Sequence, residues 1–417
     1  MKHKFRIIVG MLLLAIPLCM NAQVKPVKPQ QNPQNNEAKM KEKQEAEKIR
    51  IEQEKLNKPQ SDIKPQVKPV DQQAKPAEAQ EKPEKSKPKL GDYIQLSGFV
   101  QGMYQANLSD EGELTSNTFR MRRVRLSVEG TLYKGLTYKI QGDFSRSPML
   151  VDAYLKYKVA DAFAIQLGQF KTPFSLESPI NPVNLEIFDY GESVQKLVGY
   201  SDVCGVGSLG RDIGLMATGK LFPIKGGEGN EYHVVDYAIG VFNGNGPTTT
   251  DNNNRKDIVG RLEVHPGLKN LTLSGSYYYG KYTKDDNVNC TRNRWAAGAQ
   301  YNDGKLVLRG EYIGGKTGVE PTLIPEDLGY YNSNGYYAVA GYNFKLGKEG
   351  NQTLMPVLRY EHFTADQAIT KGGTNWYTAG INYWPLKCLN FKLDYSLVQK
   401  ESGSNSHRVV GILSYKF

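Results

Sequence analysis

Basic side chains recur at every second position along several stretches of this 417-residue chain. Arg123 and Arg125 are separated by one residue, and so are Lys156 and Lys158. In an extended strand, such pairs project from one face. A guanidinium or ammonium group there can bind an anion through charge-assisted hydrogen bonds. The candidate anion-binding residues are Arg123, Arg125, Lys139, Lys156, Lys158, Lys171, Arg261, Arg309 and Arg359.

Two interpretations of this basic set stay open. Many of the cations have an acid two or four positions along the same face, which favours a wall of ion pairs. These pairs are Arg125/Glu129, Lys139/Asp143, Arg261/Glu263, Arg309/Glu311, Arg359/Glu361 and Lys392/Asp394. Arg123 and Arg125, with Lys156 and Lys158 two strands later, have the fewest matching acids and favour a cationic track for anions. The spacing does not identify the anion.

Strands are the elements that would position these residues. Val124, Leu126 and Val128 alternate with Arg123, Arg125 and Ser127, and a helical period does not fit. Three more such segments lie before residue 160. Later strands are predicted near 163–171, 212–222, 234–243, 256–265, 270–282, 294–302, 305–314, 335–345, 353–363, 374–384, 388–399 and 407–417.

The number and connections of these strands predict an all-β fold, a 16-stranded antiparallel transmembrane β-barrel over residues 91–417. Long connectors, such as 106–117 and 172–211, alternate with short ones, such as 160–162. This parity predicts external loops at one end and periplasmic turns at the other. A soluble β-sandwich or propeller would explain the alternation, but not the parity or the C-terminal aromatic Phe417.

Residues 1–22 are typical of a signal peptide: a basic start, an apolar run and a small residue before the cleavage point. Residues 23–90 are rich in Lys, Pro and Gln and lack aromatics, which predicts a low-complexity periplasmic linker. Within it, residues 36–58 lack proline and favour a short helix or a coiled coil. The signal peptide indicates export, and the barrel indicates the outer membrane of a Gram-negative bacterium.

The net charge of +10 comes mostly from these two N-terminal segments. Residues 91–417 contain 34 basic and 32 acidic residues, so the barrel is nearly neutral. The basic balance therefore gives no reason to expect a nucleic-acid partner. A basic linker beside an anionic cell-wall polymer suggests peptidoglycan as a partner of residues 23–90.

The connector 172–211 is the longest in the predicted barrel and is rich in proline, phenylalanine and tyrosine. A connector this long and apolar is predicted to fold into the lumen and narrow the pore. Packing at a trimer interface is the rival interpretation. Its glycine-rich end, 205–210, lacks the Lys-Ser/Thr of a phosphate-binding loop.

Catalytic, metal and cofactor sites are not predicted. His233, His265, His362 and His407 are scattered without metal-ligand spacing, and each is predicted to be a turn or strand-end residue. No Gly-x-Ser-x-Gly motif is present, so the chain is not expected to be an enzyme. Cys204 and Cys290 fall in external connectors, where a disulfide between them is an open question.

Four segments resemble the phosphate-selective porin O and P family: Phe119–Gly130, Leu167–Phe174, Gly210–Leu215 and Val241–Gly246. The resemblance runs in order over most of residues 91–417. It implies a sixteen-stranded trimeric channel with an inward-folded third loop. It also implies that Arg123 and Arg125 belong to a row of lumenal arginines.

The expected function is passive diffusion of small anionic or polar solutes, with phosphate as one candidate. The expected partners are outer-membrane lipid, two further copies of the chain and the barrel-insertion machinery, which would recognise Phe417. The alternative is a barrel that serves mainly as an anchor to the cell wall or as a surface adhesin.

Overall fold

The computed structural model describes residues 93–225, 231–267, 270–283, 290–318, 329–347 and 349–417. The chain divides into two units, residues 1–84 and 85–417. The predicted signal peptide (1–22), linker (23–90) and linker helix (36–58) lie outside the described residues. Within the described ranges, no helix combines the length and the apolar character needed to cross a membrane.

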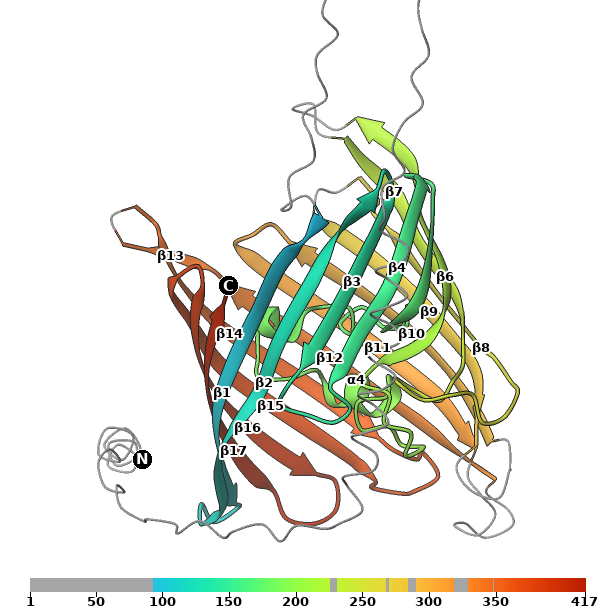
Figure 1. The fold of residues 1–417 in the computed structure, drawn as a ribbon. Coiled ribbons are helices and arrows are strands. Elements are labelled where there is room, and N and C mark those ends of the chain that lie inside the picture. The colour runs from blue at the N-terminus through green and yellow to red at the C-terminus, as the bar shows by residue number, and fades with distance from the viewer. Residues whose placement is uncertain (1–92, 226–230, 268–269, 284–289, 319–328, 348) are drawn as a thin grey trace, which may run out of the picture. The chain divides into compact units, whose positions relative to one another are not determined.

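The second unit is built of β-strands around an inner segment that carries two short helical turns (Figure 1). The strands are β1 (Gln95–Ser109), β2 (Leu114–Tyr133), β3 (Leu136–Asp143), β4 (Leu150–Ala160), β5 (Phe163–Lys171), β6 (Arg211–Lys225), β7 (Glu231–Phe242), β8 (Asp257–Val264), β9 (Leu271–Tyr282), β10 (Cys290–Asn302), β11 (Leu306–Gly318), β12 (Tyr330–Tyr342), β13 (Phe344–Leu346), β14 (Gln352–Thr364), β15 (Gly373–Leu386), β16 (Leu389–Lys400) and β17 (Ser406–Lys416).

The strands form one closed antiparallel sheet. Apart from β12 and β13, each strand pairs with its neighbours in sequence, and β17 returns to pair with β1. The segments β12 and β13 both pair with β14, in one continuous register from Asn334↔Thr364 to Leu346↔Gln352. They therefore act as a single strand of the wall. The seventeen segments make sixteen positions around the barrel, which confirms the predicted fold.

Several strands extend beyond their predicted ends. β1 has 15 residues and β2 has 20, so the predicted connector 106–117 is wrong. Only residues 110–113 lie between the two strands. The polar run Thr115–Thr118 looked like a loop, but Asn107 donates to Ser116 Oγ at 2.8 Å and the backbone ladder continues. Polar residues suit a strand that extends beyond the apolar belt.

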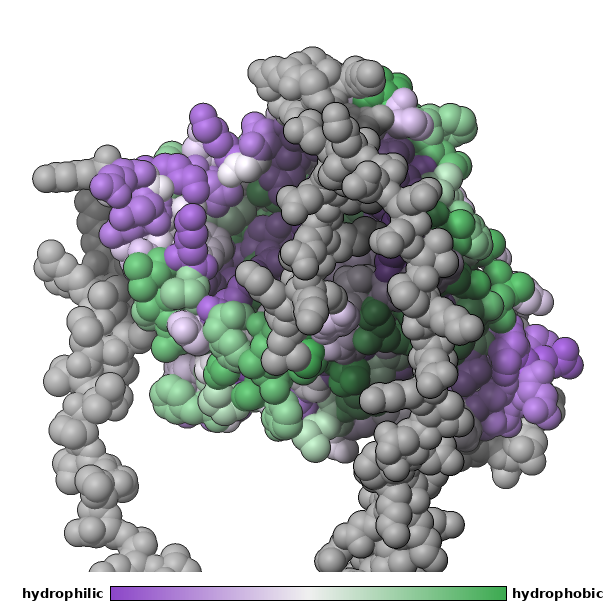
Figure 2. Space-filling model, turned by 45° about the horizontal axis from the view of Figure 1, so that its top comes forward, coloured by the Kyte–Doolittle hydropathy of each residue, from purple (hydrophilic) through white to green (hydrophobic). Residues whose placement is uncertain are grey.

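Many large hydrophobic side chains are exposed on the outer face, and Figure 2 shows them as green patches next to purple hydrophilic regions. Along β11, Leu308 and Tyr312 face outward and are exposed, while Arg309, Glu311 and Ile313 face inward and are buried. This alternation is the one that a lipid-facing barrel requires. We call the end with the turns 134–135, 161–162 and 303–305 the short-connector end of the barrel.

The segment 172–210 joins β5 to β6 and runs inside the barrel. It contains the 3-10 turn η1 (Pro182–Asn184), where Asn181 caps Val183 N, and the helix α4 (Glu192–Leu197). Its apolar residues, including Phe174, Leu185 and Val194, pack against inward-facing wall residues such as Phe242 and Ile313. An apolar cluster therefore fills part of the lumen beside the charged wall.

Phe188 of this segment also explains an irregularity in β17. Val410 and Ile412 break the polar pattern of the inner face, and both are buried against Met103 and Phe188. The two aliphatic residues thus serve as contacts for the inner segment.

Candidate functional site

Four carboxylates of the inner segment pair with five arginines of the barrel wall. The acids are Glu177, Glu186, Asp189 and Asp202, and the arginines are Arg122, Arg123, Arg294, Arg309 and Arg359. The arginines come from β2, β10, β11 and β14. The inner segment is therefore held to several parts of the wall by ion pairs between residues that are far apart in the sequence.

Glu177 lies between two of these arginines and is fully buried. Its Oε1 is 2.6 Å from Arg359 Nη1 and 3.4 Å from Arg309 Nη2, and its Oε2 accepts the N–H of Gly191 at 2.8 Å. Glu361 contacts Arg359 Nε at 2.8 Å. A Cβ on Gly191 would lie 1.9 Å from Arg359 Nη2, so a side chain there would displace this guanidinium from Glu177. Removing one member of such a buried pair costs about 3–5 kcal/mol.

A β-bulge turns two consecutive arginines of β2 into the lumen. The register with β1 passes from Gln101↔Arg123 to Gly102↔Met121, which leaves Arg122 without a backbone partner on β1. Both arginines then reach Asp189, at 2.6 Å from Arg122 and 3.4 Å from Arg123. Strict alternation would place Arg122 outside, so sequence reasoning missed it.

The wall also binds the backbone of the inner segment. Glu311 accepts a hydrogen bond from Leu176 N at 2.6 Å and one from Ser175 Oγ at 2.8 Å. Lys171, at the end of β5, donates to Ser178 O, to Ile180 O at 3.1 Å and to Tyr190 Oη at 3.0 Å. Lys171 therefore holds the start of the inner segment.

The electrostatics of the segment favour the ionised form of two of its acids, Asp189 and Asp202. Burial raises the pKa of Asp189. Arg122 and Arg123 act in the opposite direction and outweigh burial, so the pKa lies below the ordinary aspartate value. Asp202 follows the same balance: burial raises its pKa, and Arg294, 2.5 Å away, brings it below the usual range. At neutral pH these carboxylates neutralise the arginines that they contact.

The predicted ion pairs are only partly formed. Arg261/Glu263 (3.2 Å) and Arg359/Glu361 (2.8 Å) pair as predicted. Arg125 contacts Asp143 at 3.0 Å, and Lys139 contacts Glu129 at 3.0 Å, so the predicted pairs Arg125/Glu129 and Lys139/Asp143 are wrong. Cross-strand neighbours are nearer than residues four positions along one strand. Arg309 turns to the inner segment, and Lys392 donates to Leu185 O.

The predicted group of Arg123, Arg125, Lys156 and Lys158 does not form one cluster. Arg125 lies opposite Asp143 of β3, whereas Lys156 lies opposite Thr137, nearer the short-connector end. Six strand residues span roughly 20 Å. Arg123 and Arg125 are buried and paired, and the two lysines belong to a separate region.

That region is a hollow of about 300 Å³ on the lumenal face near the short-connector end. We call it the basic hollow, after the four cations that line it: Lys156, Lys158, Lys220 and Arg261. Lys158 lies 2.5 Å from Asp161, and Lys220 lies 3.5 Å from Asp236, yet both lysine side chains are more than half exposed. Among the residues that the structure describes, Lys156 forms no ion pair.

Cys204 and Cys290 both lie in a small buried cluster with Tyr282. Cys204 belongs to the inner segment and Cys290 begins β10, so a bond between them would tie segment to wall. Whether the two cysteines form a disulfide stays an open question.

Comparison with known proteins agrees with this architecture. No curated protein matches the chain. Solved structures match at low identity. An anion-selective porin from Comamonas acidovorans is 16% identical with a TM-score of 0.57, and the match covers 78% of this chain and 99% of that one. The channel DcaP of Acinetobacter baumannii is 14% identical with a TM-score of 0.53, over 78% and 97%. Salmonella typhi OmpF is 16% identical with a TM-score of 0.55, over 78% and 98%. At these identities the likeness shows the fold.

The family model of phosphate-selective porin O and P matches residues 94–411, which is most of the chain. The match spans β1 to β16, the first half of β17 and the inner segment between β5 and β6. It makes the protein a porin, an outer-membrane β-barrel channel of a kind that is typically non-enzymatic. The chain belongs to the phosphate-selective porin O and P family.

Proposed function

We propose that this porin passes small polar solutes by passive diffusion, with a preference for anions, and that residues 172–211 constrict its lumen. The observation that carries the anion preference is the basic hollow. Lys158 and Lys220 are more than half exposed, and Lys156, which is partly buried, has no ion-pair partner within the described part of the chain. The buried arginines next to the inner segment are already paired with acids.

The mechanism is electrostatic. Exposed cations inside a water-filled lumen raise the local concentration of anions and lower that of cations. Because mobile ions in the water of the lumen screen these few charges, their field acts over about a Debye length, ~10 Å at 0.1 M salt. The inner segment limits the free cross-section, so solutes pass close to the wall.

Reversal potentials in a planar bilayer under a KCl gradient test this function. The wild-type channel is expected to prefer chloride. The variant Lys156→Gln/Lys158→Gln/Lys220→Gln is expected to lose most of that preference. Lys387→Gln is the matched control, because Lys387 is an exposed lysine in the turn between β15 and β16 and does not line the hollow. Absence of any conductance would overturn the channel, and an unchanged preference in the triple variant would overturn the role of the hollow.

Phosphate is a finer proposal, which the name of the family supports. Addition of inorganic phosphate is expected to reduce the chloride current through the wild-type channel more than through the triple lysine variant. Equal effects of phosphate and sulfate on both proteins would leave general anion preference and remove phosphate selectivity.

Three further proposals concern assembly and place in the cell. The porin forms a homotrimer, its residues 23–90 lie in the periplasm and contact peptidoglycan, and Phe417 is read by the barrel-insertion machinery. Native mass measurement in detergent tests the trimer. Deletion of 23–90 tests the linker: lost co-sedimentation with sacculi at unchanged conductance would add an anchoring role to the channel.

A further inference from the structure

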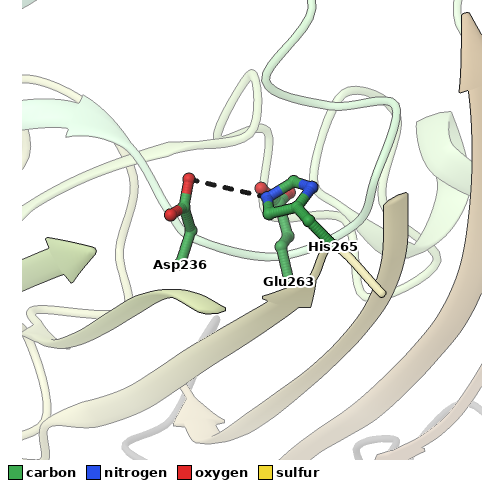
Figure 3. Close-up of side chains that lie close together, drawn as sticks. All are labelled: Asp236, Glu263 and His265. Carbon is green, nitrogen blue, oxygen red and sulfur yellow. Dashed lines mark ion pairs between the residues drawn. The ribbon is translucent and has the colours of Figure 1, made fainter. Parts of the chain in front are cut away.

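Three potential metal ligands lie together at the short-connector end, at the edge of the basic hollow. They are Asp236 on β7, Glu263 on β8 and His265 one residue beyond β8 (Figure 3). The ligand atoms of the three side chains all lie within 4.8 Å of one another. Figure 3 shows Glu263 beside His265, with Asp236 facing them and its contact with His265 drawn as a dashed line. A divalent cation between the three side chains would need only small side-chain movements to reach bonding distance.

The sheet itself brings these residues together. Asp236 and Glu263 are direct cross-strand partners. His265 is two positions after Glu263, and its N–H donates to Val234 O at 2.7 Å, which prolongs the ladder beyond β8. Glu263 and His265 therefore share the lumenal face. Two carboxylates placed opposite each other repel, and a cation between them would turn this repulsion into attraction.

The cations already present satisfy the two acids only in part. Asp236 Oδ1 is buried and has no hydrogen-bond partner. Lys220 is 3.5 Å from the other oxygen of Asp236, and its side chain is 60% exposed. An exposed pair of this kind contributes little, so Lys220 can move aside. Arg261 contacts Glu263 at 3.2 Å but also donates to Ser175 O at 3.3 Å, which gives it a second acceptor.

The imidazole of His265 is oriented for a ligand role. Its Nδ1 lies 3.2 Å from Thr272 Oγ1, and its Nε2 lies 3.8 Å from Asp236 Oδ2. When Nδ1–H donates to the threonine hydroxyl, the lone pair of Nε2 points to the carboxylates. A hydrogen bond on the far nitrogen is the usual way in which a metal-bound histidine is held.

We propose that Asp236, Glu263 and His265 bind a divalent transition-metal ion, with Zn²⁺ as the best fit. One imidazole nitrogen and two carboxylates give Zn²⁺ three protein ligands and leave a fourth position for water or a passing anion. Ca²⁺ prefers six to eight oxygen ligands, which this set does not supply. Spacing along the chain did not reveal the site, because one ligand comes from a neighbouring strand.

Metal binding by the untagged full-length porin in detergent tests the proposal. After treatment with a chelator, Zn²⁺ is titrated by calorimetry, and Co²⁺ is added separately to observe its d–d absorption. The wild type is expected to bind one Zn²⁺ at this site and to give a Co²⁺ spectrum of low coordination number. His265→Gln and Glu263→Gln are each expected to weaken binding by about tenfold or more, as loss of even an outer-shell partner often does.

His407→Gln is the matched control, because His407 is also a histidine at a strand end but contacts Tyr395 in place of acids. It should bind Zn²⁺ like the wild type. Equal Zn²⁺ affinity in the wild type and in His265→Gln would overturn the proposal. Equal competition by Ca²⁺ would also overturn it, since a merely acidic cluster behaves in that way. Far-UV circular dichroism checks the fold, and if one variant fails to fold, the other decides.

Discussion

Two regions of the lumen carry a similar kind of charge but use it differently. Around the inner segment, buried arginines meet buried carboxylates, as Arg309 and Arg359 meet Glu177. In the basic hollow, Lys158 and Lys220 are more than half exposed. In the first region, the positive charges form ion pairs that hold the segment in place. The second leaves positive charge facing water. Counting basic residues on the inner face therefore does not predict which of them act on solutes.

The largest effect is expected at the centre of the first region. Glu177→Gln leaves Arg309 and Arg359 without their shared partner and should weaken the attachment of the segment by about 3–5 kcal/mol. Single-channel recordings should show higher and noisier conductance, and a protease should cleave the segment faster.

Glu192→Gln is the control for that experiment. Glu192 lies in the same segment, but its ion pair with Lys196 is long, at 3.8 Å, and partly exposed. This variant should conduct like the wild type. A Glu177→Gln channel with wild-type conductance and protease resistance would show that apolar packing alone holds the segment.

Next in size is a contrast in ion selectivity between the two regions. Lys156→Gln should lower the chloride preference, because Lys156 lines the basic hollow without an ion-pair partner among the described residues. Arg309→Gln should change selectivity less but lower the unfolding temperature more, since its charge is buried against Glu177 and Glu186. Reversal potentials and thermal unfolding measure both. A larger change in selectivity for Arg309→Gln than for Lys156→Gln would contradict the distinction between cations that are paired with acids and cations that are open to solutes.

A smaller effect is expected from pH. The folded pKa values of Asp189 and Asp202 are depressed. Their contribution to stability is therefore present above the unfolded aspartate pKa, about 3.9, and is lost as pH falls through the lower folded values. Conductance should stay constant from pH 8 to about pH 5. An opening of the channel near pH 6 would show that groups other than these two aspartates, such as Glu311, control the release of the segment.

The smallest effect on conduction is expected from the C-terminus. Phe417 exchanges two backbone hydrogen bonds with Gly98, each 3.0 Å long, and its side chain is half exposed on the outer face. Deletion of Phe417 should lower the amount of assembled porin in the outer membrane while leaving single-channel conductance unchanged. Normal assembly of the truncated chain, measured by the heat-dependent shift in gel mobility, would count against a role in insertion.

The wall of the barrel could be predicted because the alternation of apolar and polar residues determines which side chains of a regular strand face the lipid and which face the lumen. Leu308, Tyr312 and Arg309 take the faces that their polarity demands. The inner segment has no such period, so the sequence could suggest that it lies inside but could not pair Glu177 with Arg359, 182 residues away. The bulge at Arg122 was also hidden, because a single extra residue moves the side chain to the other face. Side-chain partners across a lumen depend on three-dimensional closure.

The match between four inner acids and five wall arginines has a consequence for exchange between relatives. A segment transplanted from another porin would bring its own pattern of acids. The wall arginines of this porin pair with Glu177, Glu186, Asp189 and Asp202. Any arginine left without its acid would remain buried and charged. The inner segment and the arginines of β2, β10, β11 and β14 therefore have to change together in evolution. A chimaera should assemble only when the segment and these arginines are transplanted together.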